Sequence, residues 1–397
     1  MSALSSIFDH GQGILRLKPT FVPRAFGAAG HRLKLHPDDY YAMGMRRGAM
    51  KERWFSSTFR CMNGPDTEEL EGLSIIDGAD AGVDDMTLAE AVKAMGADLV
   101  GDDLFRRHGG WPMYSKFFDY ATPLFFHLHL DFEKARLVNL LGKPEAYYFP
   151  PQLNNYLGSA PYTYFGFDST VTREDVKQRL LRFETSDNRI TELSRAYRIE
   201  LGTGWYTPPG VLHAPGSILT YEPQWNSDVN SVFENVVSDQ VYGVNQLTEH
   251  CPPGQASIDF VMDFLDWGKN VDPAYREHYF RRPTVYRQGD GFCERLVVYG
   301  NPYFAATELT VDPGQEATLT DPAPFGLIAT QGHGRIGPYA LETPTLIRFG
   351  GRSADEYFVS EQAAGRGVRI VNESQVEPLV VLKHFADNHP SVINNQN

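Results

Sequence analysis

The stretch 123–149, PLFFHLHLDFEKARLVNLLGKPEAYYF, places two histidines two residues apart inside an apolar run. Residues i and i+2 of a β-strand point to the same side, so we expect His127 and His129 to face one interior. A single buried imidazole is readily satisfied by one hydrogen bond, whereas two on one inward face need partners that an apolar interior lacks. The pattern therefore predicts that both rings bind a ligand.

The stretch 201–216, LGTGWYTPPGVLHAPG, supplies a third histidine. Five residues separate Gly202 from Pro208, and Gly210 and His213 then follow at the spacing typical of the second motif of cupins. A tight Pro-Gly turn places His213 on a neighbouring strand, facing inward. Glu145, which begins the strand after the Gly-Lys-Pro turn, completes a set of three imidazoles and one carboxylate. Such a set suits one divalent ion such as zinc, iron, manganese or nickel.

Two other residues compete for a place in this site. Glu133 lies four residues beyond His129, at a spacing that the first cupin motif permits, and it is the alternative to Glu145 as the carboxylate ligand. The charged segment 131–136 favours a solvated loop for Glu133, so we prefer Glu145. His108, beside two glycines, is expected to be a loop residue.

Short apolar or alternating runs between frequent Gly and Pro residues predict a mainly β fold of two cupin barrels, with a few helices. We expect a metal-binding barrel with an N-terminal extension and helical insert over 1–250, a helical linker over 251–284, a degenerate second barrel over 285–387, and a polar tail over 388–397. Helical spacing and capping residues predict helices over 87–95, 172–184 and 256–269.

Composition restricts the partners of the chain. The net charge is −14 and the basic residues are scattered, which argues against nucleic-acid binding. The chain contains no run of about 18 apolar residues, so the sequence predicts no membrane span. The three cysteines form no CxxC pattern, and no signal peptide is evident, so we expect a cytoplasmic protein without disulfides. A homodimer is compatible with the sequence.

Beyond these motifs, much of the chain resembles the type I mannose-6-phosphate isomerases, which are zinc-dependent double-cupin enzymes. The similar segments include ERWFSST (52–58), WPMYSKFFDYATPLFFHLH (111–129), GKPEAYYF (142–149) and PPGVLHAPG (208–216). The resemblance implies that Lys116 and Glu222 lie at the family's catalytic lysine and acid/base glutamate. His127 stands where the family usually has glutamine. The family's phosphate-binding arginine falls near Val232, and no lysine follows until Lys269.

These departures predict an aldose–ketose isomerase that acts on an unphosphorylated or differently decorated sugar. Glu222 would move the proton and Lys116 would stabilise the enediolate. Trp205, Tyr206 and Trp225 are expected to stack on the sugar or to pack in the core. The alternatives are an iron-dependent cupin oxygenase, because three nitrogens and one carboxylate are a common ligand set of such enzymes, and a non-catalytic sugar-binding cupin.

Overall fold

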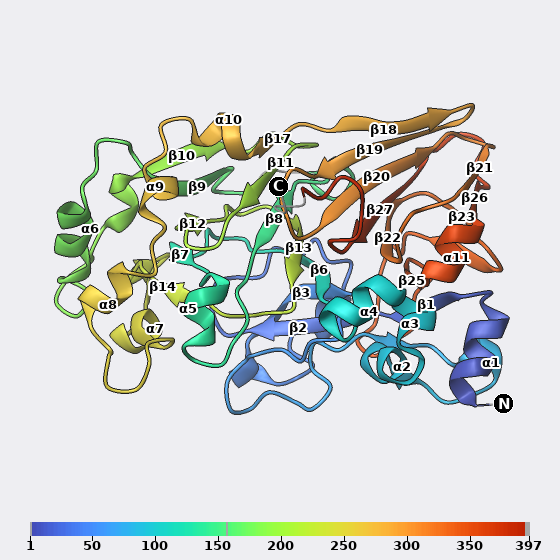
Figure 1. Cartoon of the computed structure of the whole chain (residues 1–397), viewed down its shortest axis with the longest axis horizontal. Helices are drawn as coiled ribbons and strands as arrows, with labels where there is room; N and C mark the ends of the chain where they lie inside the picture. The colour runs from blue at the N-terminus through green and yellow to red at the C-terminus, as the bar shows by residue number, and fades with distance from the viewer. Residues whose placement is uncertain (1, 156–157, 394–397) are drawn as a thin grey trace.

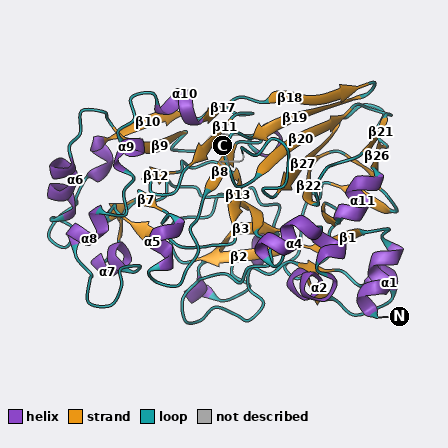
Figure 2. Cartoon of the chain, in the orientation of Figure 1, coloured by secondary structure: helices purple, strands orange, loops and turns teal. Residues whose placement is uncertain are grey.

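The computed structural model describes residues 2–155 and 158–393, and its regular secondary structure is mainly antiparallel β-sheet (Figure 1). Helices lie mainly at the periphery (Figure 2). The predicted mainly β fold of two barrels is confirmed. Each barrel is built from two sheets that enclose apolar side chains.

A seven-stranded and a five-stranded sheet form the first barrel. In spatial order the larger sheet contains β17 (Phe280–Arg281), β11 (Gly204–Thr207), β8 (Glu145–Tyr148), β13 (Thr220–Trp225), β6 (Met113–Phe118), β3 (Ala49–Phe55) and β2 (Thr20–Arg24). The smaller sheet contains β10 (Ser194–Arg198), β9 (Tyr162–Phe167), β12 (His213–Ala214), β7 (His127–Leu128) and β14 (Ser231–Val232). A hairpin of β15 (Val236–Val237) and β16 (Gln240–Val241) follows.

The second barrel has a nine-stranded and a four-stranded sheet. The larger one contains β18 (Thr284–Gly289), β19 (Phe292–Val298), β20 (Ala305–Val311), β27 (Leu379–Phe385), β22 (Phe325–Gln331), β25 (Glu356–Val359), β1 (Ile14–Lys18), β4 (Ile75–Ile76) and β5 (Met86–Thr87). The smaller one contains β21 (Glu316–Leu319), β26 (Val368–Asn372), β23 (His333–Ile336) and β24 (Tyr339–Glu342).

Three strands from the N-terminal part of the chain thus extend the sheet of the second barrel. Ile14 of β1 lies opposite Val359 of β25, and Leu17 lies opposite Ile76. The predicted domain limits, 1–250 and 285–387, do not anticipate that strands of the first segment join a sheet of the second barrel. Helix α1 accordingly lies beside the second barrel in Figure 1, far from the strands that carry the three histidines.

The helices are short. They are α1 (Ala3–His10), α2 (Leu88–Met95), α3 (Ala97–Val100), α4 (Asp102–His108), α5 (Phe132–Arg136), α6 (Arg173–Leu180), α7 (Val244–Thr248), α8 (Ile258–Met262), α9 (Trp267–Asn270), α10 (Tyr275–Tyr279) and α11 (Glu361–Arg366), besides short 3-10 turns. A capping box at Thr172 begins α6, as the sequence predicts, and a second capping box at Thr87 begins α2. The single helix expected over 256–269 is wrong, because Asp266 caps a new helix after α8 has ended.

The two barrels share one apolar core. Phe117 and Tyr221 of the first barrel and Phe358 and Leu382 of the second belong to the same buried cluster. Of the predicted polar tail, residues 388–393 pack against the second barrel, with His389 only 2% exposed, and residues 394–397 lie outside the described part. No helix within residues 2–155 and 158–393 is long and apolar enough to cross a membrane.

A buried ion pair also joins the barrels. The Arg53 guanidinium on β3 donates to Asp355, with N···O distances of 2.7 and 2.8 Å, and reaches Glu356 at 3.2 Å. Glu356 is fully buried, and Oε1 of its carboxyl group has no hydrogen-bond partner. Burial, reinforced by the neighbouring charge of Asp355, raises the pKa of Glu356 to about 8 although Arg53 opposes the shift.

This raised pKa makes the stability of the protein depend on pH. The folded-state pKa of Glu356 lies above its ordinary value of 4.5, so its stabilising contribution is complete below about pH 4.5 and is lost as the pH rises through 8. The free energy of unfolding of the wild type should fall between pH 5.5 and pH 9. In Glu356→Gln we expect this fall to be smaller by on the order of 2–4 kcal/mol. Urea unfolding at both pH values measures this difference. The exposed Glu342→Gln is the control, and equal pH dependence in all three proteins would contradict the assignment.

Candidate metal centre

Three histidines converge inside the first barrel because two short strands pair in register. His213 of β12 lies directly opposite His127 of β7, and their ring centroids are 4.2 Å apart. His129, two residues beyond His127, has its ring centroid 5.0 Å from each of the other two. One ring nitrogen from each histidine lies within 4.8 Å of the others. The three histidines are therefore close enough to hold one metal ion.

The turn that delivers His213 depends on glycine. Gly210 has φ of +78°, a left-handed conformation that favours glycine over residues with a Cβ. Its N–H donates to the carbonyl oxygen of His129 at 2.8 Å, and its own carbonyl accepts from Asp266 N–H at 3.0 Å. These bonds fix the turn between β11 and β12 against the strand that carries the first two histidines.

Backbone carbonyls orient all three rings. The Nδ1 atoms of His127, His129 and His213 lie 2.9, 2.6 and 2.9 Å from the carbonyl oxygens of Phe125, Val229 and Val211. Each Nδ1–H can donate to its carbonyl, which leaves the lone pair of Nε2 available to a metal. Burial lowers the pKa of His127 well below its usual range and that of His129 to about 3, so both rings are neutral, as a metal ligand must be.

Glu145 lies against two of these rings. Its carboxylate oxygens are 2.9 Å from His129 Nε2 and 3.0 Å from His213 Nε2, and the side chain is 1% exposed. Neither oxygen has a hydrogen-bond partner, and neither does His213 Nε2. Because the neutral His129 ring can donate through Nδ1, it presents only a lone pair to the Glu145 carboxylate, and a cation close to both groups is needed to offset their repulsion.

The spacing of these atoms fits a metal ion. Ligands bound at 2.0–2.2 Å lie about 2.8–3.6 Å from one another, with neighbouring octahedral ligands at the short end and tetrahedral ligands at the long end. The two contacts of Glu145 are at the short end of that range. Glu133, the alternative carboxylate, is exposed on α5. The geometry therefore favours Glu145, and it brings the four residues proposed as ligands to one place, with Glu145 in contact with two of the three histidines.

A lysine that the sequence analysis treated as part of a turn also reaches this cluster. Lys143 Nζ lies 3.0 Å from Glu145, 3.1 Å from His129 Nε2 and 3.6 Å from Glu222. Although burial alone would raise the pKa of Glu145, the charge of Lys143 helps to hold it well below its usual range. Lys143 precedes Glu145 by two residues. Residues at this spacing on an extended chain point to the same side, so the sequence could have indicated that Lys143 lies near Glu145.

Glu222 and Lys116 face each other beside the cluster. They are direct neighbours on β13 and β6, and Lys116 Nζ lies 3.2 Å from the Glu222 carboxylate. Burial, and next the charge of Glu145, raise the pKa of Glu222 to about 8. Burial alone would lower the pKa of Lys116, but Glu222 and Glu52 raise it above its usual value. A protonatable carboxyl group thus stands between the cluster and a charged lysine.

Arg24 extends this network and was not foreseen. Its guanidinium donates to both oxygens of Glu52 at 2.9 and 3.0 Å and to Asp228 at 3.1 Å. Trp54 Nε1 and Tyr120 Oη donate to Glu52 as well, at 2.8 and 3.2 Å. Glu52 is thereby fixed 3.7 Å from Lys116 Nζ. Nε and one terminal nitrogen of the Arg24 guanidinium are thus engaged by carboxylates of the protein itself.

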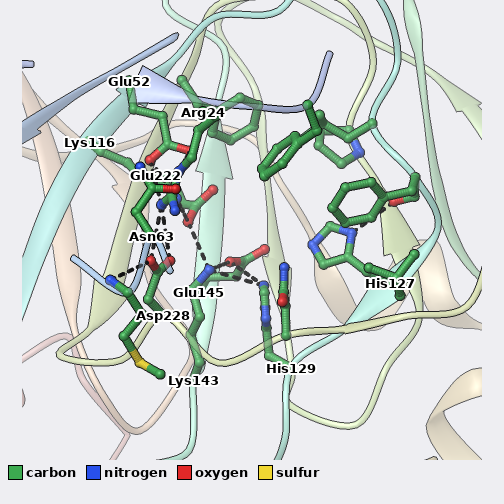
Figure 3. A pocket seen from close by; sticks show the side chains of 18 of the residues that line it. Arg24, Glu52, Asn63, Lys116, His127, His129, Lys143, Glu145, Glu222 and Asp228 are labelled. Carbon is green, nitrogen blue, oxygen red and sulfur yellow. Dashed lines mark hydrogen bonds and ion pairs between the residues drawn. The ribbon is translucent and has the colours of Figure 1, made fainter. Parts of the chain in front are cut away.

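These groups line a cavity of about 220 Å³ with two unlike walls. Acidic and basic groups gather on one side of Figure 3, and aromatic rings lie beside His127 on the other. The basic groups of the lining are Arg24, Lys116 and Lys143, and the acidic groups are Glu52, Glu145, Glu222, Asp228 and Glu249. The apolar lining includes Phe26, Phe118, Tyr120, Leu124, Phe125 and Tyr147.

The three aromatic residues expected either to stack on a sugar or to pack in the core do not line this cavity. Trp205 packs in the core against Phe165 and Tyr197, with ring centroids 4.9 and 4.7 Å away. Trp225 contacts His108 at the far end of β13, and Tyr206 is buried in the core shared by the barrels. His108 ends α4 and pairs with Asp387, which is a structural role.

The fold and site define a two-domain cupin with a cluster suited to one metal ion, and solved structures give the comparison. Mannose 6-phosphate isomerase from Bacillus subtilis is 18% identical, with 94% of this chain covering 99% of that chain at a TM-score of 0.60. A mutant phosphomannose isomerase from Salmonella typhimurium is 12% identical, with 94% and 100% covered and a TM-score of 0.63. A mannose 6-phosphate isomerase bound with zinc and yttrium is 12% identical, with 94% and 99% covered and a TM-score of 0.60.

This chain therefore has the fold of the mannose-6-phosphate isomerases, and the resemblance inferred from its motifs is confirmed at the level of the fold. No protein-family model matches the sequence, and no curated protein matches it by sequence.

Proposed function

We propose that this protein is a metal-dependent aldose–ketose isomerase that acts on an unphosphorylated sugar. The observation that carries the proposal is the position of Glu222. Its carboxyl group is buried, has a pKa raised to about 8, and lies between Lys116 and the cluster of three histidines and Glu145. An acid/base group whose pKa is close to neutral pH, beside a site for a Lewis acid, is what proton transfer next to a carbonyl requires.

Each group of residues in the site has a separate role in the proposed reaction. A divalent ion held by the three histidines and Glu145 would polarise the carbonyl and adjacent hydroxyl of an open-chain sugar. Glu222 takes the proton from C2 and returns it to C1 by way of a cis-enediol, while the proton of the C2 hydroxyl passes to the oxygen on C1. The ammonium of Lys116, held by Glu222 and Glu52, stabilises negative charge that develops on oxygen during the transfer.

The charge of the cavity supports an unphosphorylated substrate. A phosphate dianion needs free guanidinium or ammonium donors. Among the lining residues, Arg24 is held by Glu52 and Asp228, and Lys116 and Lys143 contact Glu222 and Glu145. Val232 lines the cavity, and Glu249 adds an acidic group. This lining offers no unpaired basic side chain to a phosphate and would repel it.

Nuclear magnetic resonance in deuterated water tests the proposal. We expect the protein loaded with zinc or manganese to exchange the C2 proton of at least one neutral aldose or ketose under anaerobic conditions. Exchange of the matching 6-phosphate should be slower by about 100-fold or more, since a buried unpaired charge costs several kcal/mol. Absence of exchange with every sugar at full metal occupancy would refute the isomerase. Turnover that requires iron and oxygen would support the oxygenase, which the three-nitrogen ligand set also allows.

A further inference from the structure

The seven-stranded sheet presents pocket residues on one face and the second barrel on the other. Along β13 and β6, Glu222 lies opposite Lys116 and Tyr221 lies opposite Phe117. Alternate residues of a strand point to opposite faces. Glu222 and Lys116 therefore face the cavity, while Tyr221 and Phe117 pack into the core shared with the second barrel.

Polar contacts cross this shared core behind the strands that carry pocket residues. Behind β13, the Tyr221 hydroxyl lies 3.0 Å from His384 Nδ1 on β27. Behind β8, the Tyr148 hydroxyl donates to Glu308 on β20 at 2.8 Å. Behind β3, Arg53 is held by Asp355 next to β25. β20, β27 and β25 are all strands of the nine-stranded sheet, so one sheet anchors three strands of the site.

We propose that His384 and Glu308 of the second barrel are positioning residues for the site in the first barrel, acting through Tyr221 on Glu222 and through Tyr148 on Glu145. For Glu222 this inference rests on the proposed function, and for Glu145 it rests on the metal site alone. Apolar packing fills space without fixing direction, whereas a hydrogen bond to a buried hydroxyl fixes where the strand lies. A reacting group displaced by about 1 Å can lose on the order of 100-fold in rate.

His384 is suited to this task. It is 0% exposed, and burial lowers its pKa to about 3, so the ring is neutral and its Nδ1 can accept from Tyr221. Its Nε2 has no hydrogen-bond partner, so the Tyr221 hydroxyl is the polar group that orients this ring. Leu382, two residues before it on the same strand, is part of the shared apolar core.

The first test compares two tyrosine-to-phenylalanine variants in the full-length, metal-loaded protein. Tyr221→Phe breaks the contact with His384, whereas Tyr357→Phe removes a hydroxyl group that donates to the carbonyl oxygens of Ala340 and Ala354 inside the second barrel. Both variants remove one hydroxyl group from a buried tyrosine, so both should lose similar thermal stability. We expect Tyr221→Phe alone to lower kcat about 10-fold, with KM and metal content unchanged. A kcat within twofold of the wild type, or an equal loss in both variants, overturns the role of His384.

A conservative variant refines the comparison. His384→Asn keeps a polar atom near the position of Nδ1, so we expect it to retain kcat within about threefold of the wild type. The outcome against the inference is a His384→Asn protein that is as stable as Tyr357→Phe but loses as much activity as Tyr221→Phe. It would show that the hydrogen bond is not what positions β13.

The second test does not depend on the reaction. With Co²⁺ bound in place of the native metal, we expect Tyr148→Phe to change the visible absorption spectrum and to weaken Co²⁺ binding by about 5-fold, because Glu145 lies on the same strand. Tyr357→Phe should change neither. If the wild type isomerises no sugar, the proposed function fails and this test alone decides. An unchanged spectrum and affinity in Tyr148→Phe would then overturn the inference.

Discussion

Replacing Glu222 by glutamine is expected to lower kcat for sugar isomerisation by about three orders of magnitude while the protein keeps its metal. General acid–base catalysis contributes about 10²–10⁴-fold, and no other acid in the cavity is placed like Glu222. Glutamine has nearly the same shape but can neither accept nor return the C2 proton. The isomerisation rate and the metal content of the same sample measure the effect together.

Glu133→Gln is the matched control for this variant. It makes the same chemical change at an exposed position on α5, and activity should stay at the wild-type level. Unchanged turnover in Glu222→Gln would remove Glu222 from the mechanism. Loss of metal from Glu222→Gln would instead show that this carboxyl group helps to hold the ion.

Replacing His213 by alanine is expected to reduce bound metal from one equivalent to less than about a tenth, and activity to fall below detection. His213 pairs directly with His127 and contacts Glu145 at 3.0 Å, so its loss opens the middle of the cluster. Elemental analysis of the dialysed protein, with circular dichroism to verify folding, makes the measurement.

His108→Ala is the appropriate control, because this histidine pairs with Asp387 at the end of α4 and should not affect metal content. A folded His213→Ala variant that retained stoichiometric metal would disprove the ligand set. In that case Lys143, which already lies close to His129 and Glu145, would become the central cation of the site.

Local spacing predicts the part of the site that lies on short strands. The alternation of His127 and His129 and the turn before His213 are properties of neighbouring residues, and the structure brings the three rings together. Lys143 follows the same alternation relative to Glu145, but its place between Gly142 and Pro144 made it resemble a turn residue. Its role could have been found from the spacing.

Other contacts depend on how distant segments meet. Arg24 and Asp228 are far apart in sequence, and their pairing arises only when β2 packs beside the loop after β13. Trp205 alternates with Tyr206 on β11, and sequence alone does not show which neighbours each will face. The addition of β1 to the sheet of the second barrel likewise depends on strand pairing over more than 300 residues.

The single core shared by the barrels also determines how a substrate reaches the metal centre. Every residue that lines the cavity lies between Arg24 and His250, so the second barrel forms none of its wall. Two barrels joined by a continuous apolar core and a buried ion pair do not separate as a hinge would require. Among the lining residues, Met62, Gly64 and Glu249 are exposed and Asn63 and Gln246 partly exposed, so we expect a substrate to enter and leave at this rim of the first barrel. Substitutions on this rim should alter association and dissociation rates without disturbing the chemistry below.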